Sequence, residues 1–295
     1  MTTLFDDTLE FITPAFLAGA DQACAELRVP AIRSQLRWWF RTLGATLPEE
    51  ISSFGGVHGG SPRASRVRIR AFVIRRGPQW TPPRVSPNAP SSYVWYFAQE
   101  SADGSRWTSQ GVLPPGTQWR LQVSWCDSDA VPERLVVALR AFLALGALGL
   151  RAGRGLGAFD AGHAWRTLDA SSRMALETAG FLFEDKGEVA DVDAAASLIG
   201  ALVKGTRKVH GWTNDIKHRL EIPSPMGTSG DPRQARDPRQ ASAIRFRPVK
   251  TDGGRLRVMV YEAPHERVLG VLSQKSPIVG KTPSQIVMLP PVTPR

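Results

Sequence analysis

The chain has 295 residues, 42% hydrophobic and 22% charged, which excludes a wholly disordered chain and leaves room for about two domains. Its 2 cysteines form no C-x-x-C pattern, which excludes a disulfide framework and a cysteine-based zinc site. The formal charge of +10 favours a polyanionic partner such as nucleic acid, although an arginine-biased codon usage would raise the charge in the same way.

The longest apolar stretch, 135–150, contains Arg140 and is short for a membrane span. The acidic N-terminus lacks a signal-peptide pattern. We therefore expect a soluble, cytoplasmic protein that needs no cofactor and no metal.

The first half of the chain alternates strands and helices. The expected elements are a strand starting near 7, a helix over 30–45, strands over 65–76, 91–99 and 117–126, a helix capped by Asp129 that runs to about 149, and a strand over 156–168. This order predicts a ferredoxin-like (βαββαβ) fold, the topology of RNA-recognition modules.

The second half is less regular. We expect helices over 171–183 and 191–204, strands over 242–249, 254–262 and 267–273, and a mobile loop over 223–241 that holds the tandem repeat DPRQA-R-DPRQA. The prediction is an α+β protein with two tandem ferredoxin-like domains, 1–170 and 171–295, the second smaller and divergent.

The stretch "ELRVPAIRSQLRWWFR" (26–41) leads into the helix expected over 30–45 and forms most of it. An apolar face of Ile32, Leu36, Trp39, Phe40 and Leu43 should pack on a sheet, with Trp39 as a packing residue. Arg33, Arg37 and Arg41 recur every four residues, and an anionic partner would offset their mutual repulsion. Trp38 lies on the outer flank, where an exposed indole could stack on a base. A solvated arginine face, or one that binds a neighbouring protein, is the alternative.

The stretch "GALGLRAGRGLGAF" (146–159) follows a helix and precedes a strand. Walker and Rossmann loops have the opposite order, so the pattern disfavours nucleotide binding. We expect a loop that contacts an RNA backbone, with Gly149, Gly153, Gly155 and Gly157 allowing close approach and Arg151 and Arg154 contacting phosphates. A helix cap at Gly149 followed by a tight turn is the structural alternative.

A second basic stretch, "KGTRKVHGW", adds Arg207, Lys208 and His210 as candidate RNA-binding residues. Two histidines in basic or glycine-rich surroundings, His58 and His210, leave open a metal-independent endoribonuclease that processes guide RNA. The acidic stretch over 184–193 reads as a solvated loop and helix start, so we expect no catalytic residue and no metal site.

Together these motifs resemble the RAMP superfamily of CRISPR-associated RNA-binding proteins. Within it, the ordered set "FITPAFLAGA", "ELRVPAIRSQLRWWFRTLGA" and "FGG", with the glycine-rich loop, is similar to the first-numbered subunits of type III-B (Cmr) effector complexes. The resemblance covers positions 10–160. It implies a non-catalytic subunit that binds guide RNA near its 3′ part, helps admit target RNA in antiviral defence, and assembles with the other subunits of the complex.

Overall fold

The computed structural model describes residues 1–21, 23–57, 62–98, 111–209, 243–264 and 267–268. The elements within these ranges are β1 (Thr2–Phe11), α1 (Val29–Thr42), α2 (Leu47–Phe54), β2 (Val67–Arg75), α3 (Ser92–Trp95), the 3-10 turn η2 (Tyr96–Ala98), β3 (Gln118–Trp125), α4 (Glu133–Leu145), β4 (Phe159–Asp160), the 3-10 turn η4 (His163–Trp165), α5 (Ala170–Thr178), β5 (Leu182–Val189), α6 (Val192–Val209), β6 (Ile244–Lys250) and β7 (Leu256–Glu262).

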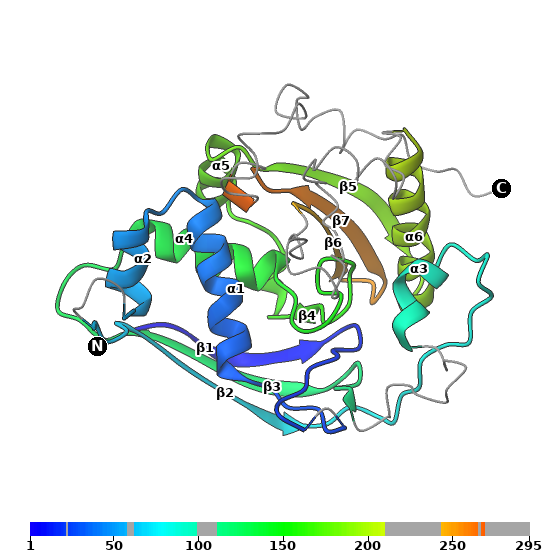
Figure 1. The fold of residues 1–295 in the computed structure, drawn as a ribbon, viewed down its shortest axis with the longest axis horizontal. Coiled ribbons are helices and arrows are strands. Elements are labelled where there is room, and N and C mark those ends of the chain that lie inside the picture. Colours follow the sequence, from blue (N-terminus) through cyan, green and yellow to red (C-terminus); the bar gives the residue numbers. More distant parts are fainter. Residues whose placement is uncertain (22, 58–61, 99–110, 210–242, 265–266, 269–295) are drawn as a thin grey trace, which may run out of the picture.

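The first half forms an antiparallel sheet with the strand order β2-β3-β1-β4. With α1 and α4 as the two crossover helices, this is the ferredoxin-like arrangement that the sequence predicts. Alternation along β3 buries Trp119, Leu121 and Val123 on the helix side. Figure 1 shows α1 and α4 on that side of β1–β3, and no described helix covers the opposite side.

The second half forms a three-stranded antiparallel sheet with the order β5-β7-β6. Helix α6 connects β5 to β6, so the described part reproduces the first βαββ segment of the same fold. The two sheets confirm an α+β protein with ferredoxin-like architecture. The predicted boundary at 170/171 remains a prediction, and the predicted mobile loop over 223–241 lies outside the described residues.

Two hydrophobic cores hold the fold together, and each draws on both halves of the chain. The first packs Trp39 against Phe181 and Tyr261, with ring centroids 5.5 and 5.3 Å apart. The second packs Phe16 and Trp95 with residues of α6, β6 and β7. As predicted, Trp39 is a fully buried packing residue.

Several predicted elements are wrong. Residues 92–98 of the expected strand over 91–99 form the helical pair α3–η2, and α6 packs so closely beside this segment that a Cβ on Gly200 would lie 1.9 Å from the Pro90 carbonyl oxygen. The acidic stretch at 184–189 is strand β5, not a loop, since Arg257 of β7 pairs with Asp185 and Glu188.

Element ends also differ from the predictions. The N-cap position of helix α4 is Pro132 rather than Asp129, and no side-chain hydrogen bond caps the helix there. The closing strand has only two residues, and 267–268 of the predicted strand 267–273 are helical. Helix α2 was not predicted, although Thr46 and Glu49 form a capping box at its start.

Candidate nucleic-acid interface

The arginine row of α1 (Arg33, Arg37 and Arg41) is held by the protein itself. Arg33 donates to the Phe54 carbonyl at 3.2 Å and to the Ser65 hydroxyl at 2.9 Å. Arg37 forms an ion pair with Glu50 of α2, and Arg41 lies 3.8 Å from the same carboxylate. Glu50 therefore already offsets part of the repulsion within the row, at Arg37 and Arg41, and a contact of the row with an external anion remains a prediction.

Burial and the neighbouring Arg37 lower the pKa of Arg33, with burial the larger cause. Arg41 differs from the other two because 52% of its side chain is exposed. Arg41 is thus the member of the row that best remains able to contact a ligand.

Trp38 is not the exposed stacking platform that its helical position predicts. Its ring is half-buried and makes edge contacts with Trp39 and Phe181. The guanidinium of Arg245, from β6, lies 3.7 Å from the ring centroid and covers one face. Arg245, from the second half of the chain, therefore covers the face of Trp38 on which a base was expected to stack.

The glycines of the loop over 146–159 allow close approach, but to the protein's own backbone. Gly149, Gly155 and Gly157 all have positive φ angles. A Cβ on Gly157 would lie 1.7 Å from the Leu148 carbonyl oxygen, and one on Gly149 would lie 2.5 Å from that of Phe16. These glycines are required by packing. Gly153 has room, with its nearest neighbour at 3.8 Å.

The two arginines of the loop have different surroundings. Arg154 is 6% exposed and donates to the carbonyls of Gly153 and Ile244, both at 3.0 Å, which ties the loop to β6. The prediction that it faces phosphates is wrong for this structure. Arg151 is half-buried, has φ 62°, and lies over the ring of Tyr96 at 4.4 Å and that of Tyr93 at 5.2 Å.

Arg151, Tyr93 and Tyr96 form a basic aromatic surface, which we call the Arg151 patch. Tyr96 is 59% exposed. The two tyrosines are absent from the predicted site because 91–99 was expected to form a strand. Their spacing of three residues is the sequence signal that would place both on one face of a helix.

The predicted basic stretch is only partly visible. Arg207 and Lys208 belong to α6, but their side chains lie outside the described part of the structure. His210 and His58 lie outside the described residues altogether. Their roles remain predictions.

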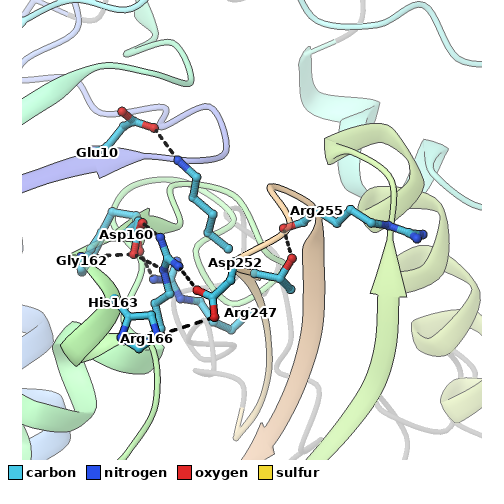
Figure 2. Close-up of polar contacts among 11 residues, drawn as sticks. Glu10, Asp160, Gly162, His163, Arg166, Arg247, Asp252 and Arg255 are labelled. Atoms are coloured by element: carbon cyan, nitrogen blue, oxygen red, sulfur yellow. Dashed lines mark hydrogen bonds and ion pairs between the residues drawn. The ribbon is translucent and has the colours of Figure 1, made fainter.

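A polar junction of side chains from β1, β4 and the β6–β7 region joins the two halves of the chain (Figure 2). Arg166 pairs with Asp160 at 2.9 Å and with Asp252 at 2.7 Å. Hydrogen bonding to Asp160 is the main reason why the pKa of Arg166 is raised. His163 lies 3.5 Å from Asp252, and Lys250 lies 3.4 Å from Glu10.

Arg247 is fully buried, which lowers its pKa to about 10, and its guanidinium donates a hydrogen bond to the Phe159 carbonyl.

A cavity of about 680 Å³ opens beside this junction. Its charged lining residues are His163, Arg166, Arg173, Glu184, Asp185, Glu188, Lys250, Asp252 and Arg257. Acidic and basic groups of the lining pair with one another, as Arg257 does with Glu188 at 2.9 Å. Such a balanced lining does not favour a polyanion.

Within the described residues, no group of three or more His, Cys, Asp or Glu side chains is placed to hold a metal ion. Among the helices of the described ranges, none has the length and apolar character needed to cross a membrane.

The chain is similar to known proteins over most of its length. Two curated relatives from Pyrococcus furiosus are CRISPR system Cmr subunits. Cmr1-1 is 28% identical over 137 residues, which cover 45% of this chain and 39% of that protein. Cmr1-2 is 30% identical over 175 residues, which cover 52% of this chain and 91% of that protein.

Solved structures share the fold. The crystal structure of Cmr1 from Pyrococcus furiosus in its apo form has a TM-score of 0.52 at 18% identity, covering 88% of this chain and 87% of that one. A chain of the type III-B Cmr-beta complex, solved by cryo-EM bound to cognate target RNA and AMPPnP in the presence of ssDNA, has a TM-score of 0.51 at 12% identity, covering 93% and 99%.

A family model also matches residues 8–160, just over half of the chain, and this segment contains both the arginine row and the glycine-rich loop. Its description is the RAMP superfamily. The chain therefore belongs to the RAMP superfamily.

Proposed function

We propose that this chain is an RNA-binding subunit of a type III-B CRISPR effector complex. It contacts guide RNA near the 3′ part, helps admit target RNA, and works beside sibling subunits without catalysing a reaction. The observation that carries the proposal is the similarity to two Cmr1 subunits, one of them matched over 91% of its length.

The Arg151 patch is the part of the glycine-rich loop that supports an RNA contact. Arg151 is held over two tyrosine rings, and Tyr96 is exposed enough to offer a face or edge to a base. A guanidinium beside aromatic rings suits a sugar-phosphate backbone with adjacent bases. Arg154, in the same loop, stabilises the loop by donating a hydrogen bond to the Ile244 carbonyl.

Salt titration of RNA binding by the full chain tests the role of the patch. For a single-stranded RNA, log K should fall with log salt by about 0.7 for each phosphate neutralised. The Arg151→Ala variant should flatten this slope by about 0.7, because one phosphate contact is lost.

The matched control is Arg134→Ala, which removes an arginine paired with Glu49 at 2.7 Å. It should leave the slope unchanged. Equal slopes for the wild type and Arg151→Ala would remove the patch from the interface. A wild-type chain that binds no RNA and co-purifies with no sibling subunit would contradict the proposed function.

An RNA cleavage assay tests the proposal that the chain catalyses no reaction. Incubating the full chain with repeat-containing RNA, without metal, should leave that RNA intact. Cleavage that disappears in the His58→Ala or His210→Ala variant would instead establish the guide-processing endoribonuclease.

A further inference from the structure

The outward face of strand β2 carries an arrangement of side chains that no role described above uses. Arg68, Arg70 and Phe72 alternate with buried or half-buried residues, so all three project from the uncovered side of the first sheet. All three are exposed, Phe72 at 54%. We call these three residues the β2 face.

The strand register shows what surrounds the β2 face. In the strand register, Arg68 lies opposite Ser124 of β3, Arg70 opposite Gln122, and Phe72 opposite Arg120. Neither of the first two partners is a carboxylate. The carboxylate of Asp6, one strand further on, is already engaged by Arg120 at 2.7 Å and by Gln122 at 3.0 Å.

The positive charge of the β2 face is therefore not compensated within the described part of the chain. Arg68 contacts the sulfur of Met1 at 3.7 Å, and no hydrogen bond or ion pair to a described residue is recorded for Arg70. Other arginines behave differently: Arg37 pairs with Glu50, Arg66 with Asp127, and Arg257 with Glu188.

Two uncompensated guanidinium groups beside an exposed aromatic ring fit a single-stranded polyanion that also has flat apolar surfaces. Arginines neutralise phosphates, and an unstacked base gains free energy by stacking on an aromatic ring. An acidic protein segment would satisfy the arginines. Nothing in the chemistry of an acidic segment calls for an exposed aromatic ring in the same row as the two arginines.

We infer that the β2 face binds a single-stranded segment of RNA, with Phe72 stacking on a base and Arg68 and Arg70 contacting successive phosphates to one side of that base. The inference rests on the proposed function, because it adds a second RNA contact to the same subunit. This contact lies on a different element from the Arg151 patch, so the two are separately testable.

The test measures binding of a fluorescein-labelled single-stranded RNA by the full chain. Phe72→Ala and Phe72→Leu should each weaken binding about fivefold to a hundredfold, because both lose the ring, whereas Phe72→Trp should bind like the wild type. Arg68→Ala/Arg70→Ala should flatten the salt slope by about 1.4 units.

Matched controls come from other exposed residues. Met174 is 66% exposed, and Met174→Ala removes surface apolar area without touching β2. Arg134→Ala/Arg173→Ala removes two arginines that pair with Glu49 and Glu177. Neither control should change the affinity or the salt slope. Crosslinking with 4-thiouridine RNA should label the peptide that contains Phe72.

Three outcomes overturn the inference. If the wild type binds RNA and the β2 variants bind equally well, the β2 face is not an RNA site and the proposed function stands. If the β2 variants bind RNA normally but no longer co-purify with a sibling subunit, the face docks a protein. If the wild type binds no RNA under any salt condition, the proposed function fails and the inference fails with it.

Discussion

Glu50 is the residue on which the arginine helix depends. Its side chain is 2% exposed and accepts the ion pair from Arg37, while Arg41 lies within 3.8 Å of its other oxygen. A buried carboxylate is costly unless it is paired, and like charges four residues apart destabilise a helix by about 0.2–0.5 kcal/mol per pair unless an anion offsets them. The two requirements are met by one residue.

Replacing Glu50 tests this dependence. Glu50→Ala should lower the free energy of unfolding by about 1–3 kcal/mol, because Arg37 and Arg41 lose their counter-ion but can partly regain water. Glu50→Gln keeps the shape and one acceptor oxygen and should lose less. Urea unfolding followed by circular dichroism measures both. An alanine variant as stable as the wild type would show that solvent alone balances the arginine row.

The glycine-rich loop shows at the scale of an element how packing decides residue identity. Its chain folds back on itself, so that the Leu148 amide donates to the Gly157 carbonyl at 3.0 Å. The amide of Gly157 donates in turn to the Pro14 carbonyl at 2.9 Å. A side chain at position 157 would break this arrangement.

Gly157→Ala should therefore destabilise the protein by about 2–4 kcal/mol, since it combines a positive φ of 66° with a Cβ 1.7 Å from a carbonyl oxygen. The control within the same loop is Gly153→Ala, whose Cβ would meet nothing closer than 3.8 Å at a backbone conformation without a positive φ, so it should leave the free energy of unfolding unchanged or raise it by up to about 1 kcal/mol. Thermal unfolding of the two variants compares them directly. Equal losses would mean that the loop does not hold this conformation in solution.

At the scale of the whole molecule, arginines join the two sheets. Arg154 reaches from the glycine-rich loop to the Ile244 carbonyl of β6, and Arg247 reaches from β6 to the Phe159 carbonyl of β4. Arg166 connects Asp160 of β4 with Asp252 in the turn between β6 and β7 (Figure 2). Motions of one half relative to the other must break these contacts.

Arg154→Ala tests this coupling. It should lower the free energy of unfolding by about 2–4 kcal/mol, because the buried Ile244 carbonyl and the part-buried Gly153 carbonyl lose a charged donor. Limited proteolysis should also cleave between the halves faster. Arg151→Ala is the matched variant from the same loop, and it should cost only about 0.5–1 kcal/mol for its contact with Tyr96. The reverse ranking would contradict the assignment of Arg154 to support and Arg151 to the surface.

The sequence predicts the α+β class, the ferredoxin-like order of the first half and the buried face of α1, because these follow from local hydrophobic periodicity. It also located the arginine row and the glycine-rich loop, which the family match covers. It could not distinguish the two loop arginines, since Arg151 and Arg154 differ only in what lies opposite them. Likewise, the acidic sequence of β5 predicts a loop, because the pairing of its carboxylates with Arg257 is not visible in the local sequence.

Which arginines remain available to a ligand depends on contacts between residues far apart in the sequence. The row on α1 is compensated by Glu50, and Trp38 is covered by Arg245 from a strand more than 200 residues away. The alternation along β2 predicts a half-buried strand with its arginines on the exposed face. The structure adds that no described helix covers that side of the sheet. The physical reason is that compensation of a charge and burial of a ring depend on groups brought together through space, which local periodicity does not encode.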